Sequence, residues 1–223
     1  MDLSKIYSGD NMKKDKIIIF LLITITLIFS IFAIYSYFSK KENTTLINNN
    51  SYKNNPFQPT KLNSSSTVSS LFTKELCTFT TPILSRDNAR QNNVEITCNN
   101  LNGNVMKNNE NFSFCSVVGK ATYEKGYLEA DIFDKEGNKI KGLGGGICQV
   151  STTLYNAVLN SNCCEIIERH PHSRYVPYAA EGLDASVAYG SIDLIIKNTS
   201  GKDILINASC TEADVTITLF TYE

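Results

Sequence analysis

A run of glycines that changes abruptly into a helical pattern is the feature that most constrains how this chain folds. Glycines dominate residues 142–146, and the apolar residues that follow recur at helical spacing over about three turns. These apolar residues are Ile147, Val150, Leu154, Ala157 and Val158. A loose glycine loop that leads into an amphipathic helix predicts that Cys148 lies in the first helical turn.

The predicted position of Cys148 favours a reactive thiolate. Unpaired backbone N–H groups and the helix dipole stabilise an anion at a helix N-terminus, and the thiolate is the nucleophilic form of cysteine. Gly144, Gly145 and Gly146 leave room for a substrate carbonyl and for N–H groups that hold an oxyanion. Gln149 follows the cysteine directly and could donate to the same oxyanion. The pattern indicates a cysteine acyl-transfer site.

Hydroxyl side chains follow the cysteine at Ser151, Thr152 and Thr153. Hydroxyls in a first helical turn commonly satisfy free backbone N–H groups without any catalytic part. We therefore interpret these three residues as capping groups.

Two histidines lie close together, at His170 and His172. A cysteine acyltransferase needs an imidazole that takes the thiol proton and later protonates the leaving amine. We favour His172 for this role, because His170 reads better as a solvated turn residue. Asp184 stands just before a predicted strand and could orient the imidazole as the third member of a triad, although loop aspartates often bond their own backbone. Arg169 could bind a substrate carboxylate in a bidentate pair or pair with a nearby acid.

A metal site is not expected. The sequence has no Cys-x-x-Cys pair and no His-Glu-x-x-His helix, and no cofactor is implied. The chain holds seven cysteines, an odd number without a compact spacing. Apart from Cys148, we interpret those in apolar or strand-like segments, Cys77, Cys115, Cys163 and Cys210, as buried small hydrophobic residues.

The N-terminal part of the chain predicts attachment to a cell membrane. Residues 17–38 are uncharged and mostly apolar, and as a helix they would rise about 33 Å, enough to cross a bilayer core. The basic excess before them predicts that residues 1–16 are cytoplasmic and that the remaining chain lies outside. A cleaved signal peptide is the competing interpretation, but the apolar run is longer than a usual signal core and no clear cleavage site follows it.

The rest of the chain reads as a linker and one domain. Residues 39–70 are rich in Asn, Ser and Pro, so we expect a flexible linker. Residues 71–223 suffice for one hydrophobic core and one catalytic domain. This domain holds more acidic than basic side chains, which argues against nucleic acid as a partner.

Short β-branched segments dominate the predicted domain. We expect helices over residues 86–101 and from 148 to about 160. We expect strands over residues 111–118, 128–133, 163–169, 187–189, 192–197, 204–208 and 215–220. The predicted fold class is α+β, with a mainly antiparallel sheet, one key helix that starts at the glycine–cysteine motif, and a preceding single N-terminal transmembrane helix.

The glycine–cysteine motif resembles the signature of VanW-domain proteins from Gly144 to Ala157. The similarity covers most of residues 71–200. It extends to Asn111–Phe114, Val118–Gly119, Gly126–Tyr127, Glu168–Arg169, His172–Ser173, Val176–Tyr178, Gly182, Asp184–Ala185 and Val187. The chain departs from the family at Asn108–Asn111, where relatives usually have Pro-Gly-Glu, and this change alters a turn.

Some membrane-anchored VanW-domain proteins are understood as L,D-transpeptidases of bacterial peptidoglycan. The resemblance implies that Cys148 attacks the carbonyl of the third residue of a tetrapeptide stem and that D-alanine leaves. The side-chain amine of a neighbouring stem then takes the acyl group and forms a 3–3 cross-link. Peptidoglycan stem peptides are therefore the expected partner, and Ser173, beside His172, is a further candidate substrate-binding residue.

Two other functions remain open from the sequence. A cysteine carboxypeptidase or amidase would give the same thioester to water instead of an amine. A non-enzymatic wall-binding or accessory protein linked to glycopeptide resistance would hold Cys148 as a buried, inert thiol.

Overall fold

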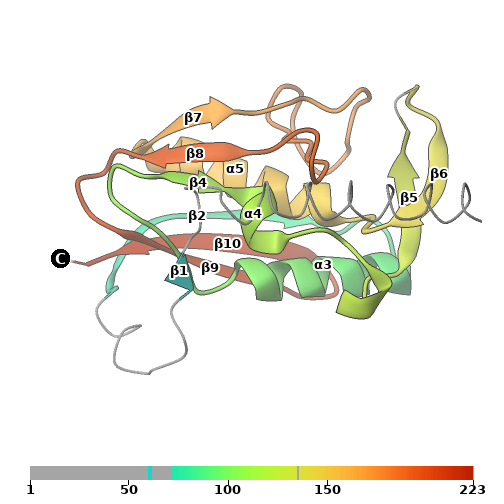
Figure 1. Ribbon diagram of the computed structural model, residues 1–223, viewed down its shortest axis with the longest axis horizontal. Coiled ribbons are helices and arrows are strands. Elements are labelled where there is room, and N and C mark those ends of the chain that lie inside the picture. Colours follow the sequence, from blue (N-terminus) through green and yellow to red (C-terminus); the bar gives the residue numbers. More distant parts are fainter. Residues whose placement is uncertain (1–59, 62–71, 135, 223) are drawn as a thin grey trace, which may run out of the picture. The chain divides into compact units, whose positions relative to one another are not determined.

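Antiparallel sheets form most of the fold in this computed structural model, which describes residues 60–61, 72–134 and 136–222 (Figure 1). The largest sheet has five strands in the order β1–β3–β9–β10–β2. Its strands are β1 (Thr60–Lys61), β2 (Lys74–Pro82), β3 (Asn104–Met106), β9 (Ile204–Cys210) and β10 (Asp214–Thr221).

Two smaller sheets accompany the five-stranded one. The first has the order β4–β8–β7, with β4 (Asn111–Ser113), β7 (Cys164–Glu168) and β8 (Ile195–Asn198). The second is a hairpin of β5 (Glu129–Phe133) and β6 (Lys139–Leu143), which stands at one end of the fold (Figure 1). The hairpin matters for function because the glycine loop follows β6 directly.

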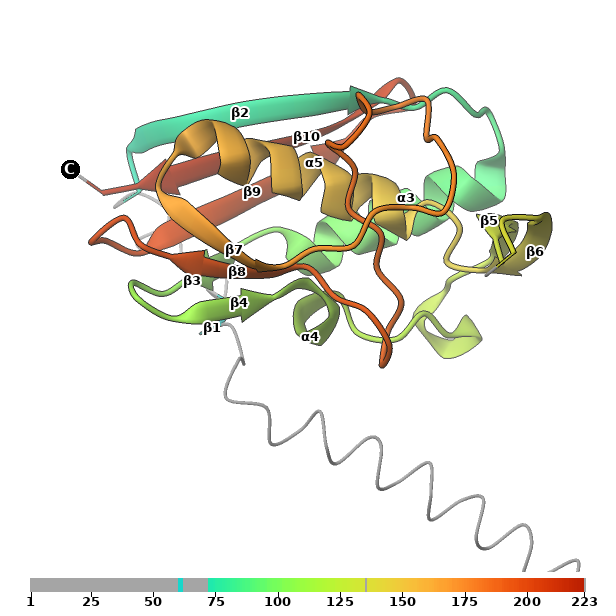
Figure 2. The ribbon, with the colours of Figure 1, turned by 90° about the horizontal axis from the view of Figure 1, so that it is seen from above.

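Two long helices, α3 (Asn88–Leu101) and α5 (Ile147–Ser161), pack against the sheets. α5 lies along β2 and β10, while α3 packs against β9 and α5. The three-stranded sheet lies beside α5 on the same side of the five-stranded sheet (Figure 2). Apolar side chains of both helices and of the two larger sheets meet in one core, which includes Val94, Leu101, Leu154, Ile196, Ile206 and Leu219.

The alternating pattern of β10 explains how the large sheet places one face in this core. Val215, Ile217 and Leu219 are buried, as expected when every second side chain of a strand points to the same face. The threonines between them point to the other face, where Thr218 and Thr216 bond the β2 hydroxyls of Thr78 at 2.8 Å and Thr80 at 2.9 Å. The predicted antiparallel α+β fold of the domain is confirmed.

One predicted strand proves to be a strand and a helix. Residues 111–118 divide into β4 and the short helix α4 (Phe114–Val118). Ser113 ends the strand because its hydroxyl accepts the N–H of Ser116 at 3.0 Å and caps α4. Asp193 supports this helix start, because its carboxylate accepts the N–H of Cys115 at 2.9 Å.

The strand predicted over residues 187–189 is also wrong. This segment forms only an isolated bridge between Ala188 and Ile192, on either side of a turn in which Gly190 has φ +82°. β8 begins later than predicted, at Ile195. The backbone from 169 to 194 is thus a long loop, and it carries most of the candidate site.

None of the helices in the described part of the chain is long and apolar enough to cross a membrane. The predicted anchor, residues 17–38, and almost all of the predicted linker, residues 39–70, lie outside the described residues.

Candidate active site

Cys148 lies in the first turn of α5, as predicted. The helix begins after Gly146, whose φ of +117° a residue with a side chain rarely adopts. A Cβ at Gly146 would lie 2.8 Å from Val94 Cγ2, and one at Gly145 would lie 2.7 Å from the carbonyl oxygen of Asp131. The glycines therefore let the start of α5 press against α3 and β5, which is a packing role.

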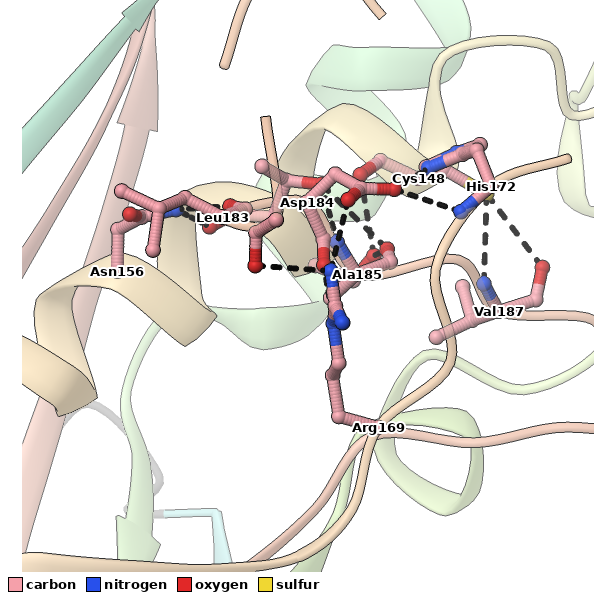
Figure 3. Close-up of polar contacts among 11 residues, drawn as sticks. Cys148, Asn156, Arg169, His172, Leu183, Asp184, Ala185 and Val187 are labelled. Carbon is pink, nitrogen blue, oxygen red and sulfur yellow. Dashed lines mark hydrogen bonds and ion pairs between the residues drawn. The ribbon is translucent and has the colours of Figure 1, made fainter. Parts of the chain in front are cut away.

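The Cys148 thiol is half-buried and has polar neighbours on more than one side. Its Sγ lies 3.4 Å from the carbonyl oxygen of Val187 and 3.5 Å from the Val187 N–H nitrogen (Figure 3). The His172 imidazole is also a neighbour of the thiol, because it lowers the pKa of Cys148 through its charge and polar contact. Cys148 is thus brought together with the favoured histidine from a loop that follows it by more than twenty residues.

Asp184 holds His172 in a fixed orientation. Oδ2 of Asp184 lies 2.6 Å from His172 Nδ1 and also accepts the His172 backbone N–H at 2.6 Å (Figure 3). Because Nδ1 faces the carboxylate, Nε2 is the ring nitrogen left for the thiol. The structure therefore brings together Cys148, His172 and Asp184, the three residues that the sequence suggested as a group.

The electrostatics of this trio favour charge separation. Burial acts to raise the pKa of the Cys148 thiol, but the hydrogen bond and charge of His172 outweigh it, and the pKa is lowered. Burial acts to lower the pKa of His172, but Cys148 and Asp184 raise it overall. Burial would also raise the pKa of Asp184, yet the His172 N–H and ring lower it. These opposite shifts favour a thiolate beside an imidazolium.

His170 does not contact this trio and pairs with Glu168 instead, with 3.0 Å between its Nε2 and Oε1 of the glutamate. Its backbone carbonyl accepts the N–H of Ser186 at 2.8 Å, which fixes the loop. The candidate role of His170 as the base is not supported by this placement.

Of the two roles that the sequence left open for Arg169, the structure shows the pairing with a nearby acid. Its Nη2 donates to Oδ1 of Asp184 at 2.7 Å and to the Gly182 carbonyl at 3.0 Å, while Nε donates to the Asp184 carbonyl at 2.5 Å. The guanidinium also lies over the ring of Tyr155, 5.4 Å from its centroid. Arg169 therefore pairs with Asp184 and stabilises the loop that carries it.

Gln149 is buried and turned away from the thiol. Its Nε2 donates to the Pro82 carbonyl at 2.9 Å and to Thr81 Oγ1 at 3.2 Å, so both amide hydrogens have acceptors. The prediction that this side chain donates to an oxyanion is wrong, because the amide ties α5 to the end of β2. Ser173 is exposed in the loop next to His172.

The hydroxyls of α5 do not cap the helix. Ser151 Oγ donates to the Ala185 carbonyl at 2.7 Å, and Thr152 Oγ1 accepts the Ala185 N–H at 3.0 Å. Asn156 Nδ2 donates to the Leu183 carbonyl at 2.7 Å (Figure 3). Polar groups along one face of α5 thus fasten the loop that carries His172 and Asp184, because this buried loop backbone needs partners that no strand supplies.

Two residues beside the site, Tyr178 and Arg90, are not among the candidates that the sequence predicts. The Tyr178 ring lies edge-on to His172 at 6.5 Å between centroids, and the Arg90 guanidinium lies 6.0 Å from the Tyr178 centroid. Tyr178 falls in a segment that matches the family pattern, which was a signal for it. Arg90 carries no motif, and only the packing of α3 against α5 reveals it.

The other thiols and the possible metal ligands are also placed by the structure. Cys115 is buried as predicted, while Cys77, Cys163 and Cys210 are only half-buried. Within the described ranges, no group of three His, Cys, Asp or Glu side chains is arranged to bind a metal ion.

The chain belongs to the VanW family, since the family model described as VanW like protein matches residues 89–220. The matched stretch contains Cys148, His172 and Asp184. The uncharacterized protein YoaR of Bacillus subtilis is 39% identical over 148 residues, which cover 66% of this chain and 48% of YoaR. The Vancomycin B-type resistance protein VanW of Enterococcus faecalis is 32% identical over 111 residues, which cover 48% of this chain and 40% of that protein. The chain therefore matches less than half the length of either relative. No solved structure matches it.

Proposed function

We propose that this domain is a cysteine acyltransferase that forms 3–3 cross-links between peptidoglycan stems, an L,D-transpeptidase. The observation that carries the proposal is the arrangement of Cys148, His172 and Asp184, in which the carboxylate lies 2.6 Å from Nδ1 of the imidazole and the imidazole lowers the pKa of the thiol. These are the parts that nucleophilic catalysis of acyl transfer requires. The substrate class comes from the VanW family resemblance.

In the first half-reaction, the Cys148 thiolate attacks the carbonyl of the third stem residue, and a C–S bond forms as the C–N bond to D-alanine breaks. The His172 imidazolium donates its Nε2 proton to the leaving amine, which departs neutral. Asp184 supports this step because its negative charge stabilises the imidazolium before the transfer and keeps the ring in place.

The developing oxyanion needs hydrogen-bond donors beside Sγ. In the first turn of α5, the N–H of Ile147 donates to Gly144 at 3.1 Å and that of Gln149 donates to Gly146 at 3.0 Å. Between them, the Cys148 N–H makes no backbone hydrogen bond within the described residues. This N–H, at the positive end of the helix dipole, is our candidate for the oxyanion donor.

In the second half-reaction, neutral His172 takes a proton from the side-chain amine of a neighbouring stem. The amine attacks the thioester carbonyl, an amide bond forms, and the Cys148 thiolate leaves. The resting thiolate–imidazolium pair is then restored. Water in place of the amine would give hydrolysis, so the acceptor decides between a transpeptidase and a carboxypeptidase.

We further propose that residues 17–38 anchor the protein in the cell membrane with the domain on the outer side, where the peptidoglycan is. The basic residues on the N-terminal side of the apolar segment support this orientation.

The test is mass spectrometry of the products that full-length protein in detergent forms from disaccharide-tetrapeptide muropeptides, with wild type beside Cys148→Ala. Cross-linked dimers and released D-alanine in the wild type alone are the expected result. Tripeptide without dimers would make the protein a hydrolase. Unchanged substrate with both folded proteins would contradict catalysis and favour a wall-binding accessory role.

A further inference from the structure

Arg90 borders the candidate site from α3. It lies in the first turn of this helix, and its Cγ would be 3.3 Å from a Cβ at Gly146, so its stem crosses the glycine that starts α5. Its Nη2 donates to Oε1 of Gln149 at 3.0 Å, and its guanidinium carbon lies 6.0 Å from the Tyr178 ring centroid. Arg90 therefore contacts residues on both sides of Cys148 in the sequence, and a residue that itself contacts His172.

No carboxylate in the described part of the chain forms an ion pair with Arg90. Asp87, three residues earlier, is engaged elsewhere. Its Oδ1 caps α3 by accepting the N–H of Ala89 at 2.8 Å, and its Oδ2 faces Lys141 at 3.6 Å.

The other arginine of the site differs in this respect. The Arg169 guanidinium donates to the Asp184 carboxylate and to the backbone carbonyls of Gly182 and Asp184. A guanidinium carries five N–H donors, and the one hydrogen bond from Arg90 to Gln149 uses a single donor. The remaining fork of Arg90 matches a planar carboxylate in geometry and charge.

We propose that Arg90 binds the free C-terminal carboxylate of the residue that leaves when Cys148 is acylated. This inference rests on the proposed function and adds a specificity determinant to it. The leaving D-alanine is the last residue of a tetrapeptide stem, so its carboxylate lies within one residue, roughly 3.5 Å of extended chain, of the scissile bond. The Arg90 side chain runs from Gly146, where its Cγ lies, to Gln149, where its Nη2 donates, so its guanidinium lies beside the residue that follows Cys148.

The proposed contact explains which stem peptides would serve as acyl donors. A carboxylate that pairs with Arg90 selects stems with one residue beyond the scissile bond, because a further residue moves the carboxylate away. An internal peptide bond has no carboxylate there at all. The site would therefore act at the end of a stem and leave internal bonds intact.

The experiment compares two tetrapeptide donors, one with a free C-terminal carboxylate and one with a C-terminal carboxamide, in full-length wild type, Arg90→Gln and Arg90→Lys. KM and kcat are measured from release of D-alanine or D-alaninamide. In the wild type we expect a preference for the carboxylate of at least tenfold in kcat/KM, the usual scale for a charge-assisted hydrogen bond. Arg90→Gln is expected to lose this preference, so that its kcat/KM values for the two donors become similar. Arg90→Lys should retain part of the preference.

Arg86→Gln is the matched control, because it removes a positive charge from an exposed residue just before α3. It should keep the wild-type preference. If the wild type turns over both donors equally, or if Arg90→Gln keeps the preference, the role of Arg90 is wrong and the proposed function stands. If the wild type releases nothing from either donor, the proposed function fails and the inference with it. Should Arg90→Gln fail to fold, Arg90→Lys still tests the proposal. A carboxylate preference in Arg90→Lys that is smaller than in the wild type would support it, and an equal preference would contradict it.

Discussion

Oδ2 of Asp184 accepts both the Nδ1–H and the backbone N–H of His172, each at 2.6 Å. One carboxylate oxygen therefore fixes the ring and the chain segment that carries it. The other oxygen, Oδ1, pairs with Arg169 at 2.7 Å, which keeps the carboxylate from turning. The orientation of the imidazole toward Cys148 thus depends on a single loop, and that loop depends on Arg169 and on α5.

Replacing Asp184 with asparagine tests the orienting role. We expect Asp184→Asn to lower kcat by roughly 10²- to 10⁴-fold, because the amide supports the wrong tautomer of His172 and does not stabilise the imidazolium. The measurement is the rate of D-alanine release from a tetrapeptide stem. Asp203→Asn is the control, since Asp203 pairs with Lys107 at 2.7 Å without contact to the trio. Equal rates in wild type and Asp184→Asn would contradict the triad.

The pH dependence of thiol alkylation tests the ion pair. The pKa of Cys148 is lowered, so its thiolate persists as the pH falls until the pH passes this lowered value. The pKa of His172 is raised, so its positive charge persists as the pH rises toward that value. Iodoacetamide should therefore label Cys148 well below pH 8, and His172→Ala should move the labelling to higher pH.

Labelling must be resolved by peptide mass spectrometry, because a second thiol is also activated. The hydrogen bond from Cys164 lowers the pKa of Cys163 to about 6. Cys115 serves as the internal control, since burial raises the pKa of its thiol and should leave it unlabelled in the folded protein. A Cys148 that reacts only after unfolding would identify an inert thiol.

Thr152→Val tests how α5 holds the catalytic loop. The valine keeps the shape but leaves the buried Ala185 N–H without its 3.0 Å acceptor, which should cost about 1–3 kcal/mol in the free energy of unfolding and lower kcat. Urea unfolding gives the stability. Thr218→Val is the control, because its 2.8 Å bond to Thr78 lies on the solvent side of the large sheet and should change stability by about 0.5 kcal/mol or less. Similar losses in both variants would refute the fastening role.

Gly146→Ala tests the close approach at the start of α5. The φ of +117° and a Cβ 2.8 Å from Val94 Cγ2 should together cost about 3 kcal/mol or more. Gly201→Ala shares a positive φ of +83° but meets nothing within 4 Å, so we expect a cost of about 1 kcal/mol. Thermal unfolding of the two variants separates the backbone strain from the clash, and equal costs would show that packing at Gly146 is unimportant.

Local patterns were sufficient for much of the fold. The helix that starts beside Cys148 follows from apolar spacing after a glycine run, and β9 and β10 follow from β-branched alternation, because these signals depend on neighbours in the chain. Residues 111–118 are not one strand as predicted, and one of the contacts that support the start of α4 comes from Asp193, about eighty residues away. A pattern of neighbouring residues carries no information about such a partner.

The sequence by itself determined that Cys148 begins a helix behind glycines and that one of two histidines and Asp184 are its candidate partners. Only the tertiary structure decided between the histidines, because the loop bonds of Asp184 turn His172 to the thiol while Glu168 takes His170. The tertiary structure also decided which arginine among the described residues is left unpaired beside the site. Arg169 is engaged by Asp184, whereas Arg90 reaches the site through the packing of α3 against α5. The physical reason is that a charged side chain's role depends on which opposite charge lies within a few ångströms, and that distance is set by folding.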